Sequence, residues 1–244
     1  MRTVGIVQAR MGSSRLPGKV LMPAVGTPLI VHMLRRVSRC RTLDALWLAT
    51  SVNRENDPLE ACVAAEGHKV FRGSEEDVLS RFWSIAKAEG AQLVVRLTGD
   101  CPLHDPEVID DVVAFARAHE NDYAYVGNAL RPTYPDGLDV EVCTAAALDH
   151  AYRHATDPRD REHVMPYIHR FHIDPGAAHV FHFRGPADFS HLRWTLDGPA
   201  DYTFIREVLE RLLPQAPDFC WLDVVALLTR EPQLLQLNGG LRFR

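Results

Sequence analysis

The sequence lacks a basic excess and any long apolar segment, and each absence excludes a class of protein. The 244 residues contain 27 Lys and Arg against 32 Asp and Glu, a formal net charge of −5. Such a chain has no general attraction for nucleic acid or an anionic membrane, so any anion must bind at a local site. The apolar run after Arg2 is too short for a signal peptide or a membrane span, which predicts a cytoplasmic protein.

Paired cysteines are missing as well. The five cysteines are odd in number, and none stand as C-x-x-C, which argues against a disulfide framework or a structural zinc site. Two H-x-x-H pairs occur, His169 with His172 and His179 with His182. The second pair lies on an expected strand, where this spacing points the rings apart, and we assign a metal to neither pair.

Apolar, β-branched runs alternate with segments of helical period, which predicts an α/β fold with a mostly parallel sheet and helices on both faces. Strands are expected at 3–9, 45–51, 68–72, 92–98, 138–142, 178–183 and 192–196. Helices are expected at 29–37, from 57, at 78–85, from 106, at 145–155 and 162–171, and twice near the C-terminus. We expect one domain over 1–244, with an irregular acceptor-binding or dimerisation subregion inserted around 123–185.

The loop from Val7 to Leu21 joins the first strand to the first helix, where open α/β sheets bind ligands beyond their strand ends. Its two glycines, Gly12 and Gly18, allow close approach of phosphate oxygens, and its three cations predict a bound anion. These cations are Arg10, Arg15 and Lys19. The loop is not a Walker loop, because the glycine spacing is one residue too long and Val follows Lys19, nor is it a G-x-G-x-x-G fingerprint.

The loop resembles the A-R-x-G-S-x-R-L-P-G-K signature of CMP-sugar synthetases, in particular 3-deoxy-manno-octulosonate cytidylyltransferases and the spore-coat polysaccharide protein F group. The resemblance implies a Rossmann-like nucleotide-diphospho-sugar transferase fold, a homodimer, and transfer of CMP from CTP to a small anionic acceptor. It also implies that the nucleotide is contacted by Gln8, Ala9, Arg10, Gly12, Ser13 and Lys19.

The likeness continues past the first loop. Residues 72–81 are similar to the segment that this family places around the cytosine and ribose, although part of the stretch also fits a plain helix core. Further nucleotide contacts are therefore expected at Arg72, Ser74, Asp77 and Arg81.

Two acidic motifs predict the metal site. Residues 99–103 resemble the family's G-D-x-P-L motif and residues 197–201 its D-x-P-x-D segment. The resemblance implies that Asp100 and Asp197 bind Mg²⁺, which usually takes one or two protein carboxylates, and that Thr98 and Gly99 adjoin the nucleotide. Asp201 fits a helix N-cap as well as a catalytic role, and both interpretations stay open.

The acceptor is expected on the middle of the chain. Residues 134–142 resemble the spore-coat group's P-D-G-x-D-V-E-V stretch, and alternation along a strand would put Asp139 and Glu141 on one face, toward either an acceptor or solvent. The R-E-H-V stretch at 161–164 also fits this group. His163 and Arg193 are further candidate acceptor contacts.

The sequence thus predicts an Mg²⁺-dependent cytidylyltransferase that releases pyrophosphate, with an acidic sugar, a phosphonate or another small acid as acceptor. The predicted catalytic residues are Arg10, Arg15, Lys19, Asp100 and Asp197. One alternative is a sugar transferase of the same fold, in which residues 139–141 form a D-x-D-like metal motif for a nucleotide sugar. Another is a catalytically inactive nucleotide-binding protein. The cation-rich loop favours nucleotidyl transfer, because a triphosphate must be neutralised.

Overall fold

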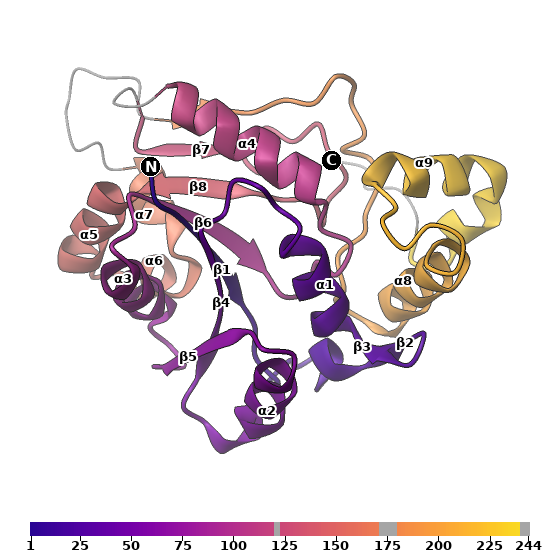
Figure 1. The fold of residues 1–244 in the computed structure, drawn as a ribbon, viewed down its shortest axis with the longest axis horizontal. Helices are drawn as coiled ribbons and strands as arrows, with labels where there is room; N and C mark the ends of the chain where they lie inside the picture. The colour runs from indigo at the N-terminus through magenta and orange to yellow at the C-terminus, as the bar shows by residue number, and fades with distance from the viewer. Residues whose placement is uncertain (120–122, 171–179, 240–244) are drawn as a thin grey trace.

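The computed structural model describes residues 1–119, 123–170 and 180–239. Its main sheet has seven strands in the order β5-β4-β1-β6-β8-β7-β9 (Figure 1). Their bounds are β1 Thr3–Gln8, β4 Ala45–Ser51, β5 Lys69–Gly73, β6 Leu93–Thr98, β7 Tyr125–Gly127, β8 Glu141–Thr144 and β9 Val180–His182. The first four are parallel, whereas β8 runs antiparallel to both β6 and β7. The predicted mostly parallel sheet is confirmed.

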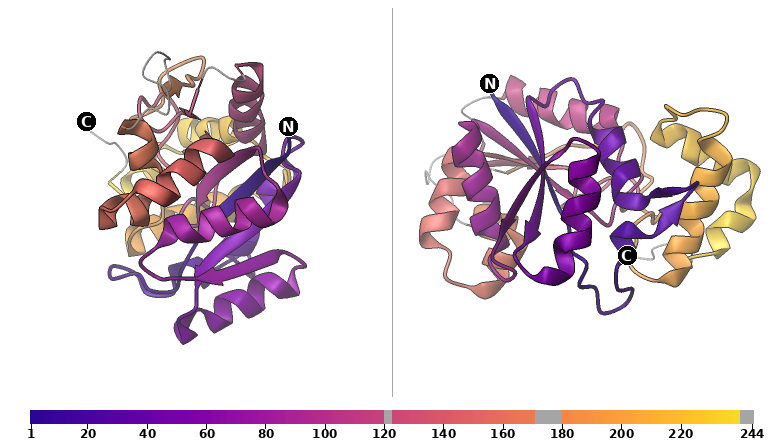
Figure 2. Two further views of the ribbon diagram at one scale, coloured as in Figure 1. Left: turned by 90° about the vertical axis from the view of Figure 1, so that its left-hand side faces the viewer. Right: turned by 60° about the horizontal axis from the view of Figure 1, so that its bottom comes forward.

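Helices cover both faces of this sheet (Figures 1 and 2). One core contains side chains of α1 Leu29–Val37, α2 Asp57–Ala65, α4 Pro106–Ala118, α8 Pro199–Leu212 and α9 Trp221–Arg230. The opposite core contains side chains of α3 Val78–Glu89, α5 Ala145–His154 and α7 Met165–Arg170. The strand β1 lies inside the sheet and contributes to both cores, with Val7 in the first and Val4 and Ile6 in the second. A strand that is buried on both faces needs apolar side chains at successive positions, which explains the continuous apolar run in its sequence.

Shorter elements complete the described chain. They are the hairpin of β2 Pro23–Ala24 and β3 Thr27–Pro28, the helix α6 Pro158–His163, and the 3-10 turns η1 Lys19–Leu21, η2 Arg54–Asn56 and η3 Pro232–Gln236. No helix among the described residues has the length and apolar character needed to cross a membrane. The five cysteines are all free thiols.

Several expected elements differ from the structure. The helix expected at 162–171 is two helices, α6 and α7, separated at Val164, and residue 171 lies outside the described range. Pro166 accounts for the break, because proline has no N–H for a continuous helix and its ring clashes with the preceding turn. The strand expected at 192–196 is wrong: Arg193 makes only an isolated bridge to Asp136.

Two strands are shifted or shortened. The strand expected at 138–142 begins at Glu141 instead, and of the strand expected at 178–183 the structure describes Val180–His182. His172 and His179, one member of each H-x-x-H pair, lie outside the described residues. The subregion expected around 123–185 contributes β7, β8 and β9, so its described part extends the main sheet.

Candidate active site

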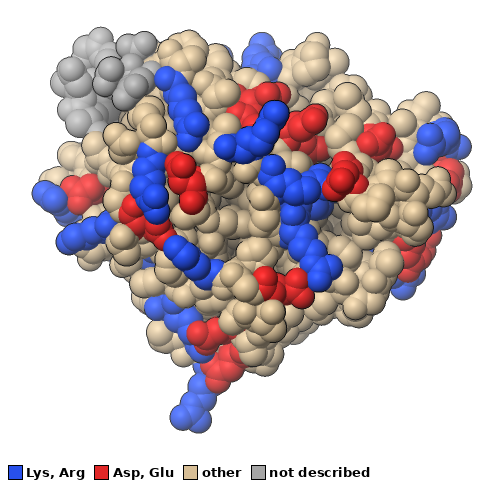
Figure 3. All heavy atoms as spheres, viewed as in Figure 1, with Lys and Arg blue, Asp and Glu red and all other residues tan. Residues whose placement is uncertain are grey.

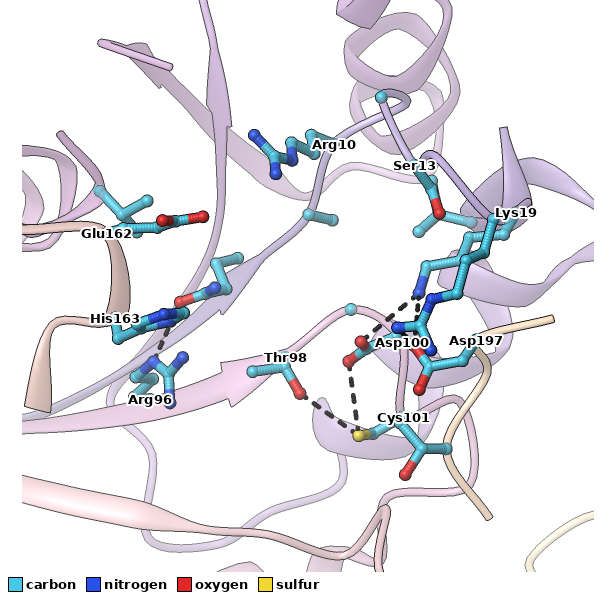
Figure 4. A pocket seen from close by; sticks show the side chains of 18 of the residues that line it. Arg10, Ser13, Lys19, Arg96, Thr98, Asp100, Cys101, Glu162, His163 and Asp197 are labelled. Atoms are coloured by element: carbon cyan, nitrogen blue, oxygen red, sulfur yellow. Dashed lines mark hydrogen bonds and ion pairs between the residues drawn. The ribbon is translucent and has the colours of Figure 1, made fainter. Parts of the chain in front are cut away.

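A cavity of about 490 Å³ opens where the strands β1 and β6 end, beside the first loop (Figure 4). It is lined by Gln8, Ala9, Arg10, Gly12, Ser13, Ser14, Arg15, Lys19, Val20, Val78, Arg81, Arg96, Thr98, Gly99, Asp100, Cys101, Asp139, Glu162, His163, Thr195 and Asp197. Most of the predicted site residues are therefore brought together. Figure 3 shows basic and acidic side chains interspersed over one face of the molecule, with no single extended basic patch on that face.

The first loop is closed by its own backbone and seated on a neighbouring turn. The Gly18 N–H donates to the Met11 carbonyl at 2.9 Å, with Gly18 in the left-handed region at φ 71°. A Cβ on Gly12 would lie 2.7 Å from a carboxylate oxygen of Glu55 in η2. Gly18 is thus required by its backbone conformation, whereas a side chain at Gly12 would only displace the flexible Glu55 carboxylate.

Gly99 brings the Thr98–Asp100 turn against the base of the loop. Its N–H donates to the Gln8 carbonyl at 2.8 Å, and a Cβ at this position would lie 2.6 Å from the Cβ of Ala9. A side chain at residue 99 would push the two strand ends apart. The absence of one sets Asp100 beside the loop that carries Lys19.

The two predicted metal ligands converge on one ammonium group. Lys19 Nζ lies 3.5 Å from Asp100 Oδ2 and 3.4 Å from Asp197 Oδ1, and it donates to the Leu196 carbonyl at 2.5 Å (Figure 4). The Leu196 N–H in turn donates to the Asp100 carbonyl at 2.7 Å. Direct backbone bonding therefore holds the two distant acidic segments side by side.

Asp197 is held in its charged form. Burial by itself raises the pKa of Asp197, but Lys19, Arg15 and Arg193 together outweigh it and leave that pKa below its usual value of 3.8. Arg15 lies 2.8 Å and Arg193 3.0 Å from the carboxylate. Three cations around one carboxylate also define a place where phosphate oxygens are favoured.

Arg193 and Asp201 lie behind this cluster rather than on the cavity wall. Arg193 pairs with both Asp197 and Asp201. Asp201 accepts hydrogen bonds from the N–H groups of Asp197 at 2.9 Å and Gly198 at 2.8 Å, at the start of α8. The N-cap of α8 is Gly198, so the N-cap interpretation of Asp201 is wrong: α8 begins at Pro199, and Asp201 in its first turn accepts from the N-cap backbone instead. This geometry gives Asp201 a structural role at the helix start, and it gives Arg193 the position of a support for Asp197.

Arg81 is a buried cation with unused donors on the cavity wall. It is only 3% exposed, and within the described residues its Nε and Nη1 atoms have no hydrogen-bond partner. Burial lowers the pKa of Arg81 from its usual value of 12.5. Unsatisfied buried donors are expensive, so this side chain fits a ligand that supplies acceptor atoms.

The other residues expected around the cytosine lie off the cavity. Arg72 pairs with Glu60 at 2.6 Å, and Ser74 Oγ accepts from the Asp77 N–H at 3.1 Å. Asp77 caps α3 and pairs with Arg161 at 2.6 Å. The structure therefore gives these three residues protein partners, and it does not bring them to the cavity with Arg81.

The two acids expected to share a strand face differ in their surroundings, and only Glu141 belongs to a strand. Asp139 lines the cavity, whereas Glu141 pairs with Arg96 and accepts from the Tyr125 hydroxyl at 3.1 Å. Arg96 itself lines the cavity and donates to Gln8 at 3.0 Å, although no sequence motif pointed to it. Its position two residues before Thr98 on one strand, hence on the same face, is the signal that would have found it.

Comparison with known proteins identifies the family. Residues 4–212 match the model of the cytidylyltransferase family. The chain belongs to this family. It is 37% identical over 234 residues to the spore coat polysaccharide biosynthesis protein SpsF of Bacillus subtilis, covering 93% of this chain and 94% of that protein.

Solved structures of similar fold agree. A cytidylyltransferase from Leptospira borgpetersenii has a TM-score of 0.89 and 29% identity, covering 97% of both chains. A CMP:2-keto-3-deoxy-manno-octonic acid synthetase complexed with CTP has a TM-score of 0.67 and 19% identity, covering 86% of this chain and 99% of its own, and shows the likeness of fold alone. The predicted fold and family are confirmed, and this cytidylyltransferase is a nucleotidyltransferase enzyme.

Proposed function

We propose that this cytidylyltransferase transfers CMP from CTP to a small acidic acceptor in an Mg²⁺-dependent reaction that releases pyrophosphate. The observation that carries the proposal is the convergence of Asp100 and Asp197 on Lys19 beneath a loop bearing Arg10 and Arg15. Nucleotidyl transfer needs charge neutralisation and positioning far more than it needs a nucleophilic side chain, and this cavity supplies both.

The donor set fits a hard divalent cation. The carboxylates of Asp100 and Asp197 lie close enough together for both to contact one positive charge, that of Lys19. Mg²⁺ usually takes one or two protein carboxylates and keeps waters and phosphate oxygens as its remaining ligands, so two carboxylates are enough to hold it beside a triphosphate. Asp100 and Asp197 would hold the ion, and the bound ion would neutralise charge on the phosphate oxygens.

The chain's own cations carry the rest of the proposed chemistry. Arg10, Arg15 and Lys19 bind the triphosphate and stabilise the charge that grows on the departing pyrophosphate. An oxygen of the acceptor forms a bond to the α-phosphorus in line with the bridging oxygen. The bond to that bridging oxygen breaks, and the acceptor's proton passes to solvent.

The base end of the nucleotide is assigned to the buried Arg81. Its unpaired Nε and Nη1 donors need acceptor atoms, which the carbonyl and ring nitrogen of a cytosine provide. Gln8, Thr98 and Gly99 line the same cavity and complete the proposed nucleotide contacts. Arg72, Ser74 and Asp77 are not part of this set, because they bond to protein groups away from the cavity.

The names of the relatives favour a sugar acid as the acceptor. The similar proteins are named for spore coat polysaccharide biosynthesis and for octonic acid activation. Pyrophosphate release should be screened with CTP, UTP, ATP and GTP against 3-deoxy-manno-octulosonate, its 8-amino-8-deoxy analogue, N-acetylneuraminate and 2-aminoethylphosphonate, with Mg²⁺ and with a chelator. We expect release from CTP with a sugar acid and none with the chelator.

Two results of the screen would reject the proposal. Consumption of a nucleotide sugar without pyrophosphate release would support the sugar transferase alternative. Tight CTP binding with no turnover of any acceptor would support the inactive nucleotide-binding protein. The homodimer expected from the family resemblance stays a prediction, which light scattering tests.

A further inference from the structure

The backbone of Val164 adopts a conformation that valine rarely takes. Its φ is 69° and its ψ is −59°, in the γ-turn region, and its side chain is fully buried at 0% exposure. A β-branched residue at positive φ is a genuine outlier. Such strain persists only where the surroundings over-determine it, and it collects at functional sites.

The residues around this turn are tied to the rest of the molecule. Asp160 is buried and pairs with Arg170 across the break between α6 and α7. Arg161 pairs with Asp77 at 2.6 Å and donates to the Ala155 carbonyl at 3.0 Å. The Val164 N–H donates to the Asp160 carbonyl at 2.9 Å. Three of the five residues from 160 to 164 are therefore fixed by partners outside the cavity.

The two residues between Arg161 and Val164 have side chains without such partners. Glu162 and His163 are exposed and line the cavity, and neither makes a hydrogen bond or ion pair within the described parts of the chain. Figure 4 shows both across the pocket from Lys19, Asp100 and Asp197. The strained turn thus adds nothing to the bonding of these two side chains, but it presents them to the cavity.

We propose that the Val164 turn holds Glu162 and His163 as specificity-determining residues for the acceptor, an inference that rests on the proposed nucleotidyl transfer. A carboxylate only accepts hydrogen bonds, so Glu162 selects a donor group on the acceptor, either a hydroxyl or an amino group. Asp139 adds a second carboxylate to the same cavity. The acceptor class is therefore a hydroxylated or amino-substituted acid rather than a bare carboxylate or phosphonate.

The specificity arm of the test compares Glu162→Ala, Glu162→Gln and the control Glu76→Ala, an exposed glutamate outside the cavity lining. The acceptor is the acid from the screen above that releases most pyrophosphate. We expect Glu162→Ala to raise the acceptor KM at least about tenfold and Glu162→Gln to raise it less, because an amide oxygen still accepts. Calorimetric Kd for CTP should stay within about twofold, and the control should match the wild type.

An unchanged acceptor KM in Glu162→Ala, with normal CTP binding, overturns the inference alone. Absence of CTP binding and turnover in the wild type overturns the proposed function instead, so the two failures are distinguishable. The size of the loss with the octulosonate and with its 8-amino analogue shows whether a hydroxyl or an amino group is received.

The strain arm needs no substrate. Both Val164→Ala and Val164→Gly lose the buried side chain, but only glycine relaxes at positive φ. We expect Val164→Gly to melt at a higher temperature than Val164→Ala, the reverse of the usual order. Val164→Gly should also raise the acceptor KM while leaving the CTP Kd unchanged. A glycine variant that melts at or below the alanine variant, or that keeps the wild-type acceptor KM, overturns the role of the turn.

Discussion

The two walls of the cavity differ in how their charges are used. On the wall built from the first loop and the acidic turns, Lys19, Asp100, Asp197 and Arg15 are bonded to one another. On the opposite wall, Glu162 has no hydrogen bond or ion pair among the described residues. Charges that are already organised suit catalysis, because they need little rearrangement when charge develops. A charged side chain without a protein partner, such as Glu162, is suited to bind a group of the incoming acceptor.

The largest effect should follow from breaking the organised wall. Asp100→Asn keeps the size of the side chain and removes its charge, and we expect kcat to fall by about a hundredfold or more. Pyrophosphate release measures the loss, with the melting temperature as a check that the fold is intact. A rate close to the wild type would show that the wall containing Lys19, Asp100 and Asp197 does not carry out the chemistry. The assignment of catalysis to this wall would then be wrong.

The next prediction compares two buried arginines, one whose donors bond to protein carbonyls and one with donors that have no partner in the described chain. Arg36 donates to the carbonyls of His104 at 2.8 Å and Phe219 at 3.1 Å, whereas the Nε and Nη1 donors of Arg81 are unsatisfied within the described chain. We expect Arg81→Met to raise the CTP Kd about tenfold or more, since a hydrogen bond to a charged group is worth about 1.5–3 kcal/mol, and not to lower stability.

Arg36→Met is the matched control for that experiment. It should leave the CTP Kd unchanged and lower the free energy of unfolding by about 1–3 kcal/mol, because buried carbonyls lose their donor. Calorimetry and urea unfolding measure the two quantities. If Arg81→Met unfolds as easily as Arg36→Met, then Arg81 is a structural residue.

A smaller effect concerns Asp110, a carboxylate with partners that contrasts with Glu162. It accepts from the backbone N–H groups of Arg41 at 3.0 Å and Thr42 at 2.9 Å. Burial raises the pKa of Asp110, but the hydrogen bond from the Thr42 hydroxyl, together with these backbone bonds, outweighs burial and leaves that pKa below its usual value of 3.8. Because the folded-state pKa is depressed, this stabilisation is present above the unfolded value and is lost as the pH falls through the folded value.

Asp110→Asn should therefore lower the free energy of unfolding by about 1–2 kcal/mol at neutral pH. The difference in the free energy of unfolding between Asp110→Asn and the wild type should become smaller once the pH falls well below 3.8. Urea titrations at neutral and acidic pH measure it. A gap of constant size would mean that the charge of Asp110 contributes nothing.

The smallest effect is expected at Arg72, the predicted nucleotide contact that the structure places off the cavity. Arg72→Gln should leave the CTP Kd and kcat unchanged and should change the free energy of unfolding only slightly, since its ion pairs are partly exposed and screened by solvent. A clear rise in the CTP Kd would restore the expectation made from sequence.

The sequence was sufficient where a segment is long, apolar and buried. The strands β1, β4 and β6 fall within a residue or two of their expected bounds because their side chains enter a core. The segment 192–196 shows the limit of this argument. Leu192, Trp194 and Leu196 are buried at alternate positions, as in a strand. The N–H groups of Trp194 and Leu196 bond to Asp136 and Asp100 instead of a neighbouring strand, and periodicity does not reveal such partners.

The site was predictable only in part for a similar reason. Resemblance selected Asp100 and Asp197, which the structure brings together, and it selected Arg72 and Asp77, which the structure gives to other partners. Whether a selected residue reaches the cavity or pairs with another side chain depends on which oppositely charged residues lie near it in the folded chain. Local sequence does not contain that information. The helix expected at 162–171 ran across the break at Val164, although Pro166 signals that break. The ion pair between Arg161 and Asp77, 84 residues apart, is a long-range contact that local sequence does not reveal.

The contact between Lys19 and Asp197 joins positions 178 residues apart in the chain. At a synthesis rate of about 5–20 residues per second, roughly 10–40 seconds separate the two residues on the ribosome. For all of that interval the nascent protein has a cationic loop without the Asp197 carboxylate, although Asp100 is made 81 residues after Lys19. The proposed metal site is therefore completed late in translation. An incomplete chain that meets cellular nucleotides has only one of the two carboxylates proposed to hold the metal.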